Sequence, residues 1–152
     1  MTTQRVAAIP AAPELYKKLI ALHTAVEHEA VAAGLDQKLI ELVKIRASQI
    51  NGCAFCIDMH STAASKLGED IRRIHALPAF RESGFFTARE EAALALTESV
   101  TLLAETRVPD DVYEAAAKEF SEAELTQLIW AITVINAFNR LSVTSRNTPP
   151  PL

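Results

Sequence analysis

Residues 124–143, with the sequence ELTQLIWAITVINAFNRLSV, carry apolar side chains on nearly every side of a helix. A helix of this kind is stable only where other elements surround it. We therefore expect it to be buried inside the domain or at an interface between subunits. No apolar run in the chain approaches the length that a membrane span needs, so a spanning helix is not expected.

The rest of the sequence has the three- and four-residue spacing of helices and no convincing alternating strand. Helices are predicted over residues 13–30, 37–50, 53–67, 69–77, 88–105 and 110–120. Asp36, Thr87 and Ser121 have the type and position of N-terminal caps, and Gly52 can end a helix in the left-handed conformation. Pro109 fits the first turn of the helix that follows it.

The composition agrees with these helices, because the chain has only 4 glycines and 49% hydrophobic residues, many of them alanine and leucine. A length of 152 residues allows one domain with a full core. We predict an all-α fold, a single-domain helical bundle at residues 13–145, with an N-terminal extension at 1–12 and a flexible tail at 146–152. In the first helix, five apolar side chains should share one face: Leu15, Leu19, Leu22, Val26 and Ala30.

The charge of the chain excludes some partners. A net charge of -4 and a pI near 5.6 give no electrostatic reason to bind nucleic acid or an anionic membrane. The first residues lack a stretch long enough for a secretory signal. We therefore expect a cytoplasmic protein, in which thiols are kept reduced and a purely structural disulfide is not expected.

The segment NGCAFCIDMH, residues 51–60, contains the only two cysteines of the chain. Successive residues of an α-helix turn by about 100°, so Cys53, Cys56 and His60 share one arc of the predicted helix. Two thiols one turn apart can close a disulfide reversibly, and an imidazole within reach can take or return a proton near neutral pH. Cys53 also lies at the helix start, where free N–H groups favour a thiolate.

Glu41 joins this group if the two helices fold back on each other. The Asn51-Gly52 break favours such a hairpin, in which Glu41 lies about level with the stretch just past His60. A carboxylate at this place could hold the imidazole in one tautomer and share its proton. Glu41, His60 and Cys56 are therefore a candidate proton relay.

Simpler interpretations of the same residues remain open. The two cysteines could be buried and inert, and Glu41 could be a solvated charge that pairs with Lys44 or Lys38. Zinc could bind Cys53, Cys56, His60 and Glu41, although ligands so close on one helix face form a cramped tetrahedron.

Polar and aromatic residues elsewhere have structural interpretations. His23 and His28 are off the helical repeat and are not expected to form a metal pair. Asn136, Asn139 and Arg140 interrupt the apolar helix, and we expect them to bond to nearby backbone and to the helix end. Trp130 should lie in the core or at an interface.

The motif of Glu41, eleven residues, Cys53-Ala-Phe-Cys56, three residues and His60 resembles the signature of AhpD-like alkylhydroperoxidases. These enzymes are the peroxidase branch of the carboxymuconolactone decarboxylase superfamily. The likeness extends from about residue 13 to residue 143 and includes KIRASQINGCAFCIDMHSTAASKLGE and NAFNRLSV.

The resemblance implies a thiol peroxidase in antioxidant defence, with an all-α fold that assembles into trimers or hexamers and uses no cofactor. Cys56 would attack a small organic peroxide or hydrogen peroxide, and Cys53 would resolve the product as a disulfide. His60 and Glu41 match the proton-relay positions. A dithiol, carried by a lipoyl group or a thioredoxin-like protein, would recycle the disulfide. Phe55 stands where the best-studied members have a histidine, so that second imidazole is missing from the motif.

Three other functions remain possible from the sequence. They are a disulfide reductase without peroxidase activity, an enzyme of the carboxymuconolactone decarboxylase type, and an oligomeric zinc-binding or redox-sensing module. The decarboxylase branch works without the C-x-x-C pair, which argues against it here.

Overall fold

The computed structural model describes residues 3–152, and among these it contains helices and no strand. The helices are α1 (Ala8–Ala11), α2 (Pro13–Ala33), α3 (Gln37–Asn51), α4 (Ala54–Lys66), α5 (Ile71–Ala76), a 3-10 turn (Leu77–Ala79), α6 (Phe80–Ser83), α7 (Ala88–Thr101), α8 (Leu103–Thr106), α9 (Asp110–Glu119) and α10 (Glu122–Ser145). The predicted all-α fold is thus confirmed.

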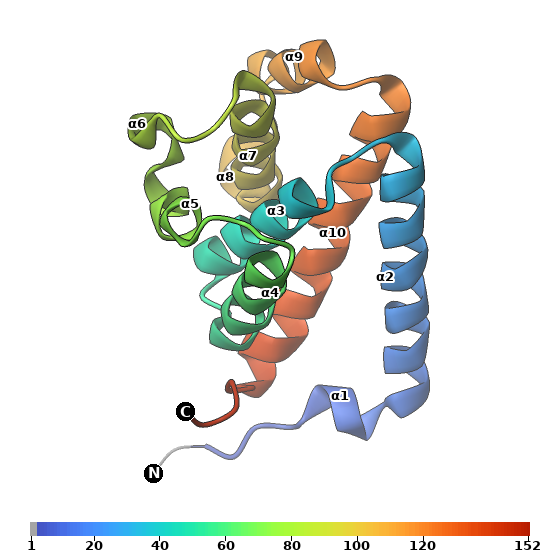
Figure 1. Ribbon diagram of the computed structural model, residues 1–152. Helices are drawn as coiled ribbons and strands as arrows, with labels where there is room; N and C mark the ends of the chain where they lie inside the picture. Colours follow the sequence, from blue (N-terminus) through green and yellow to red (C-terminus); the bar gives the residue numbers. More distant parts are fainter. Residues whose placement is uncertain (1–2) are drawn as a thin grey trace.

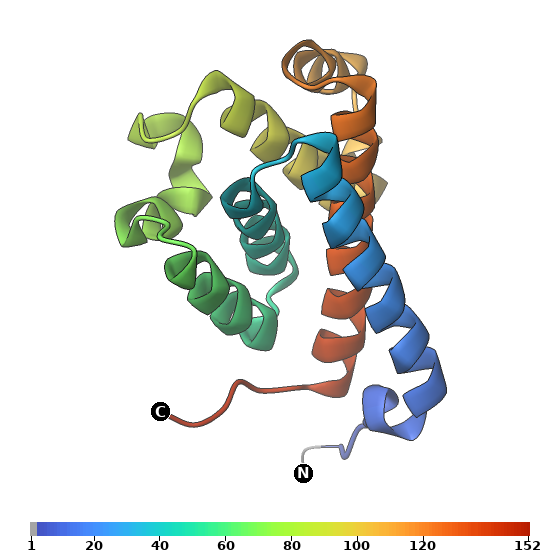
Figure 2. The same ribbon diagram turned by 45° about the vertical axis from the view of Figure 1, so that its right-hand side comes forward.

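Helix α3 is the centre of the bundle. It packs against α4, α7 and α10, and α2 packs along α10 (Figure 1). Leu39, Val43 and Ile132 belong to one buried apolar cluster that joins α3 to α10. Leu42 and Leu94 belong to a second cluster, which joins α3 to α7 and to the α5–α6 region. The turned view shows α3 and α4 as neighbours on one side of the long α2–α10 pair (Figure 2).

Helix α10 is enclosed on most of its sides, as its sequence predicts. Leu128, Ile132 and Ile135 are buried in it, with at most 3% of their surface exposed. Trp130 differs, because 47% of its surface is exposed. Trp130 was predicted to lie in the core or at an interface, and within a single chain it does not lie in the core.

The predicted caps of the main helices are present. The Oδ1 of Asp36 accepts a hydrogen bond from the backbone N–H of Lys38 at 2.7 Å. Gly52 ends α3 with φ 68°, which an L-residue adopts only with strain. Thr87 and Ser121 each open a capping box, at the start of α7 and of α10.

The segment after α7 differs from the prediction of one helix over residues 88–105. The helix stops at Thr101 and a short α8 follows a kink at Leu102. Thr106 Oγ1 donates to the backbone carbonyl of Ser99 at 2.6 Å, a side-chain bond that stabilises the folded-back turn. Pro109 is the N-cap of α9 and lies just outside its first turn.

The N-terminal residues lie against the bundle. Helix α1 contacts α2 and α10. The guanidinium of Arg5 donates to the carbonyl of Thr144 at 3.1 Å, and the N–H of Ala8 donates to Ser145 Oγ at 3.2 Å. The two ends of the chain are therefore on the same side of the molecule (Figure 1). Within residues 3–152, none of the helices has both the length and the apolar character needed to cross a membrane.

The first half of α2 is less buried than its periodicity predicts. Val26 and Ala30 are in the interior, as expected. Leu15 and Leu22, which the same pattern placed on that face, are 69% and 40% exposed. Helix α2 therefore packs fully on the bundle only in its second half.

Candidate functional site

The two cysteines lie at the tight turn between α3 and α4. Cys53 is the N-cap of α4, and its backbone N–H donates to the carbonyl of Ser48 at 2.9 Å. Its Sγ accepts from the N–H of Cys56 at 3.3 Å. The left-handed conformation of Gly52 makes this reversal possible, so the sequence break at this point positions the first thiol.

Cys53 and Cys56 are joined by a disulfide, with their Cα atoms 5.3 Å apart. Each residue exposes only 2% of its surface. The site is thus in its oxidised form, as the one-turn spacing permits. In this form the two sulfur atoms are bound to each other. Residues 3–152 contain no group of three or more His, Cys, Asp or Glu side chains placed to hold a metal ion.

Glu41 and His60 meet across the α3–α4 hairpin. The Nδ1 of His60 is 2.8 Å from Oε2 of Glu41, and the two residues expose only 6% and 7% of their surface. The predicted contact between them is therefore present. When Nδ1 carries the hydrogen that this bond uses, Nε2 remains as the basic atom of the ring. The structure brings all four predicted site residues to one hairpin.

Lys44 completes the polar cluster, although from the sequence it was only a possible partner of Glu41. Its Nζ is 3.0 Å from Oε1 of Glu41 and also contacts the carboxylate of Glu27 on α2. Lys44 is 3% exposed, so it lies buried between two carboxylates. The pairing of Glu41 with Lys44, which the sequence left open, is therefore present, but the pair is not solvated. Burial raises the pKa of Glu41, but the hydrogen bond of His60 and the charge of Lys44 outweigh it and lower that pKa below 4.5.

A cavity of about 180 Å³ lies beside these groups. Of the two cysteines, Cys56 lines it, together with His60 and Lys44. The rest of its wall is mainly apolar and aromatic, from α1, α2, α4 and α10: Ile9, Tyr16, Ile20, Phe55, Met59, Ile135 and Phe138. The reactive end of the cavity is therefore polar, and its body suits an uncharged organic molecule.

His23 also lines this cavity, from α2. Its ring meets the ring of Phe138 edge to face, with centroids 5.7 Å apart. His28 is different, since its side chain is 81% exposed and lies near Glu29. The sequence did not mark His23 as a site residue, because only the packing of α2 brings it near α4.

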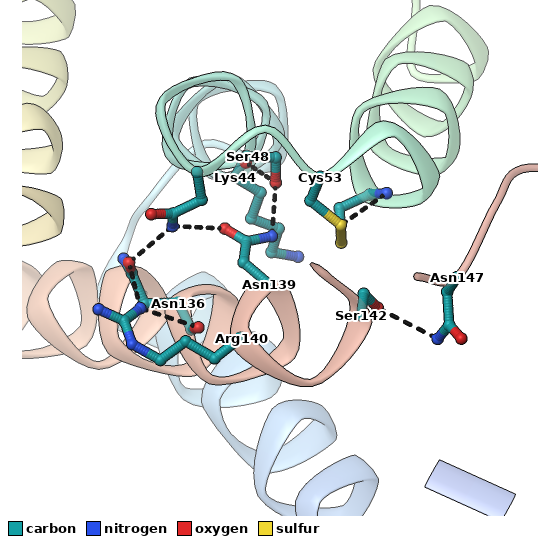
Figure 3. The surroundings of a disulfide bond; sticks show 10 residues. Lys44, Ser48, Cys53, Asn136, Asn139, Arg140, Ser142 and Asn147 are labelled. Atoms are coloured by element: carbon teal, nitrogen blue, oxygen red, sulfur yellow. Dashed lines mark hydrogen bonds between the residues drawn. A yellow bond between two sulfur atoms is a disulfide. The ribbon is translucent and has the colours of Figure 1, made fainter. Parts of the chain in front are cut away.

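An amide network holds the hairpin turn on α10 (Figure 3). Asn51 Nδ2 donates to the side-chain oxygens of Asn136 and Asn139, both at 2.9 Å. Asn139 Nδ2 donates to Ser48 Oγ at 3.0 Å, and Arg140 donates to Asn136 Oδ1 at 2.9 Å. The predicted bonds to nearby backbone are present, since Asn136 donates to the carbonyl of Ile132 at 2.9 Å and Arg140 donates to that of Asn136 at 3.1 Å. The side chains also link α10 to the end of α3, two residues before Cys53, which was not predicted.

The sequence is similar to a known protein family and to known relatives. Residues 13–99 match the model of the carboxymuconolactone decarboxylase family. The protein YdfG of Bacillus subtilis, which is uncharacterised, is 39% identical over 145 residues, covering 95% of this chain and 96% of YdfG.

Solved structures agree with the fold. A protein of unknown function from Agrobacterium tumefaciens, described as a candidate antioxidant defence protein AhpD, superposes with a TM-score of 0.89 at 37% identity, covering 99% of this chain and 100% of that chain. The debrominase Bmp8 superposes with a TM-score of 0.78 at 18% identity, covering 93% of this chain and 74% of Bmp8. At that identity the second likeness shows the fold alone.

Proposed function

The chain belongs to the carboxymuconolactone decarboxylase family, and we propose that it is a thiol-dependent peroxidase of the alkylhydroperoxidase type. Its redox centre is the Cys53–Cys56 pair. Cys56 is the attacking thiol, Cys53 is the resolving thiol, and His60 with Glu41 moves the proton. The likeness to the Agrobacterium tumefaciens protein, described as a candidate antioxidant defence protein, supports this assignment.

One observation carries the proposal. Cys56 lines a largely apolar cavity, and the imidazole of His60, which lines the same cavity, is hydrogen-bonded to the buried carboxylate of Glu41. A structural disulfide needs neither a cavity nor a histidine–carboxylate pair. A thiol that reacts with a peroxide can use both, because the substrate must reach the sulfur and the thiol must lose its proton.

The reaction can be written with these residues. His60 takes the proton of the Cys56 thiol, and the thiolate attacks the peroxide oxygen farther from the organic group. An S–O bond forms as the O–O bond breaks, so sulfur is oxidised to a sulfenic acid. The departing oxygen takes the electron pair of the O–O bond and the proton from His60, and leaves as an alcohol, or as water when the substrate is hydrogen peroxide.

Cys53 then closes the cycle. Its sulfur attacks the sulfur of Cys56, a disulfide forms, and hydroxide leaves with the thiol proton of Cys53 as water. An external dithiol, such as a lipoyl group or a thioredoxin-like protein, returns the pair to the reduced form. We further propose that the protein works in the cytoplasm as a homo-oligomer, a trimer or hexamer.

The test is a single oxidation of the pre-reduced protein by cumene hydroperoxide or hydrogen peroxide. Mass spectrometry should then find a loss of two hydrogens and no interchain linkage. His60→Ala should shift the reaction to higher pH, towards that of a free thiol at about 8.5, and Glu41→Ala should act in the same direction but less strongly. Two free thiols after treatment would refute the redox assignment. Zinc bound to protein purified without chelator would favour the metal-binding alternative.

A further inference from the structure

We propose that His23 is a further catalytic residue of the peroxide reaction, and that its imidazole donates a hydrogen bond to the oxygen that leaves with the organic group. The inference rests on the proposed function. It adds a second imidazole to the site, from a helix that the C-x-x-C motif does not include.

The position of His23 is the first argument. The side chain comes from α2 and lines the cavity whose α4 wall is formed by Cys56 and His60. A peroxide bound between α2 and α4 would thus have the sulfur and an imidazole on one wall and His23 on the other. The edge-to-face contact with Phe138 restricts the ring of His23.

The second argument is that this imidazole is available for a ligand. His60 is engaged by Glu41 at 2.8 Å, and His28 is 3.5 Å from Glu29. Among residues 3–152 no comparable carboxylate partner engages His23. A histidine held in an apolar wall with ring nitrogens unpaired by the protein can form its hydrogen bonds with a bound substrate.

The third argument is its charge state. Burial lowers the pKa of His23, and the positive charge of Lys44 adds to this, against the opposing effect of Glu27 and Glu41. Lys44 and His60 line the same cavity as His23. At neutral pH it is an uncharged imidazole with one N–H donor and one acceptor.

The chemistry needs such a donor. As the O–O bond breaks, negative charge develops on the oxygen that keeps the organic group. His60 supplies the proton that this oxygen finally takes. A hydrogen bond from the N–H of His23 stabilises the developing charge and aligns the O–O bond with the sulfur of Cys56.

The experiment compares His23→Ala, His23→Gln and the exposed control His28→Ala in single-turnover oxidation by cumene hydroperoxide. We expect His23→Ala to lower the second-order rate constant by about 100- to 1,000-fold, the range for one lost hydrogen-bond donor to a transition state. His23→Gln retains a donor and should recover part of the rate. His28→Ala should react at the wild-type rate.

A second measurement separates this role from that of a base. The pH dependence of Cys56 alkylation by iodoacetamide should keep the wild-type midpoint in His23→Ala, because His60 takes the thiol proton. A midpoint raised as far as in His60→Ala would overturn the inference, and so would a wild-type oxidation rate in His23→Ala. If the wild-type protein is not oxidised by peroxide at all, the proposed function itself is wrong, and the role of His23 inferred from it is wrong as well.

Discussion

The ammonium of Lys44 lies 3.0 Å from Oε1 of Glu41, while Oε2 of the same carboxylate contacts His60. One buried carboxylate therefore joins the ammonium of Lys44 to the imidazole of the redox site. Lys44 also contacts Glu27, which ties α2 to the α3–α4 hairpin. Removal of this cation would leave two carboxylates in or near the interior without their partner.

Lys44→Met should for this reason destabilise the protein by about 3–5 kcal/mol, the usual cost of leaving a buried charge without its partner. The measurement is urea unfolding at neutral pH. Lys17→Met is the matched control, because Lys17 and Glu14 form an exposed pair with 72% and 77% of their side-chain surfaces accessible. It should cost less than about 1 kcal/mol. Equal losses in the two variants would contradict this account of Lys44.

Stability should also depend on the ionisation of Glu41. Its pKa lies below 4.5 in the folded state, because the contacts with His60 and Lys44 outweigh burial. The ionised carboxylate thus stabilises the fold at pH values above 4.5, the ordinary pKa of a glutamate, and this contribution is lost as the pH falls through the lowered pKa. Between pH 7 and pH 3, the thermal unfolding midpoint of the wild type should fall as this contribution is lost. Glu41→Gln should lack this part of the pH dependence. Glu114→Gln, at an exposed position on α9, should follow the wild-type profile.

Much of this site could be predicted from the sequence, because it is local. Cys53, Cys56 and His60 lie on one helix, and the Gly52 break turns that helix back beside Glu41. The contributions of Glu27 and His23 could not be predicted in this way. Both come from α2, and the angle at which α2 crosses the hairpin depends on side-chain packing, which the periodicity of one helix does not determine.

The same distinction holds for the fold. The capping boxes at Thr87 and Ser121 start α7 and α10 where they were predicted, because each is a local hydrogen-bond pattern. The end of α7 was missed, since Thr106 returns to bond the carbonyl of Ser99 and competes with continued helix. The limits of the N-terminal extension and of the tail stay predictions.

The roles of the two cysteines can be separated by trapping the oxidised thiol. Cys53→Ser should react once with peroxide and keep a sulfenic acid on Cys56, because no resolving thiol remains. Cys56→Ser should give no sulfenic acid and no turnover. Labelling with dimedone followed by mass spectrometry measures both. The reverse pattern would make Cys53, at the helix start, the attacking thiol.

The amide network should stabilise the hairpin turn. Asn139 is fully buried and bonds both Ser48 and Asn51, so Asn139→Ala leaves their polar groups without this partner. We expect a loss of about 2–3 kcal/mol in urea unfolding. Asn147→Ala is the control, because Asn147 has only a 3.5 Å side-chain contact to Ser142. A similar loss in both variants would show that the network adds little.

The last prediction is that the protein is a homo-oligomer. Leu15, Leu22 and Trp130 are large apolar side chains that one chain leaves 69%, 40% and 47% exposed. Contact with a second copy would remove them from water, at about 25 cal/mol for each Å² of apolar surface buried. Light scattering at micromolar concentration should give a multiple of the 16.6 kDa chain mass, and Leu22→Glu should shift the protein towards that mass. Lys17→Met, which changes an exposed polar residue of the same helix, should not. A wild-type mass near 16.6 kDa would contradict the prediction and would leave these side chains in water.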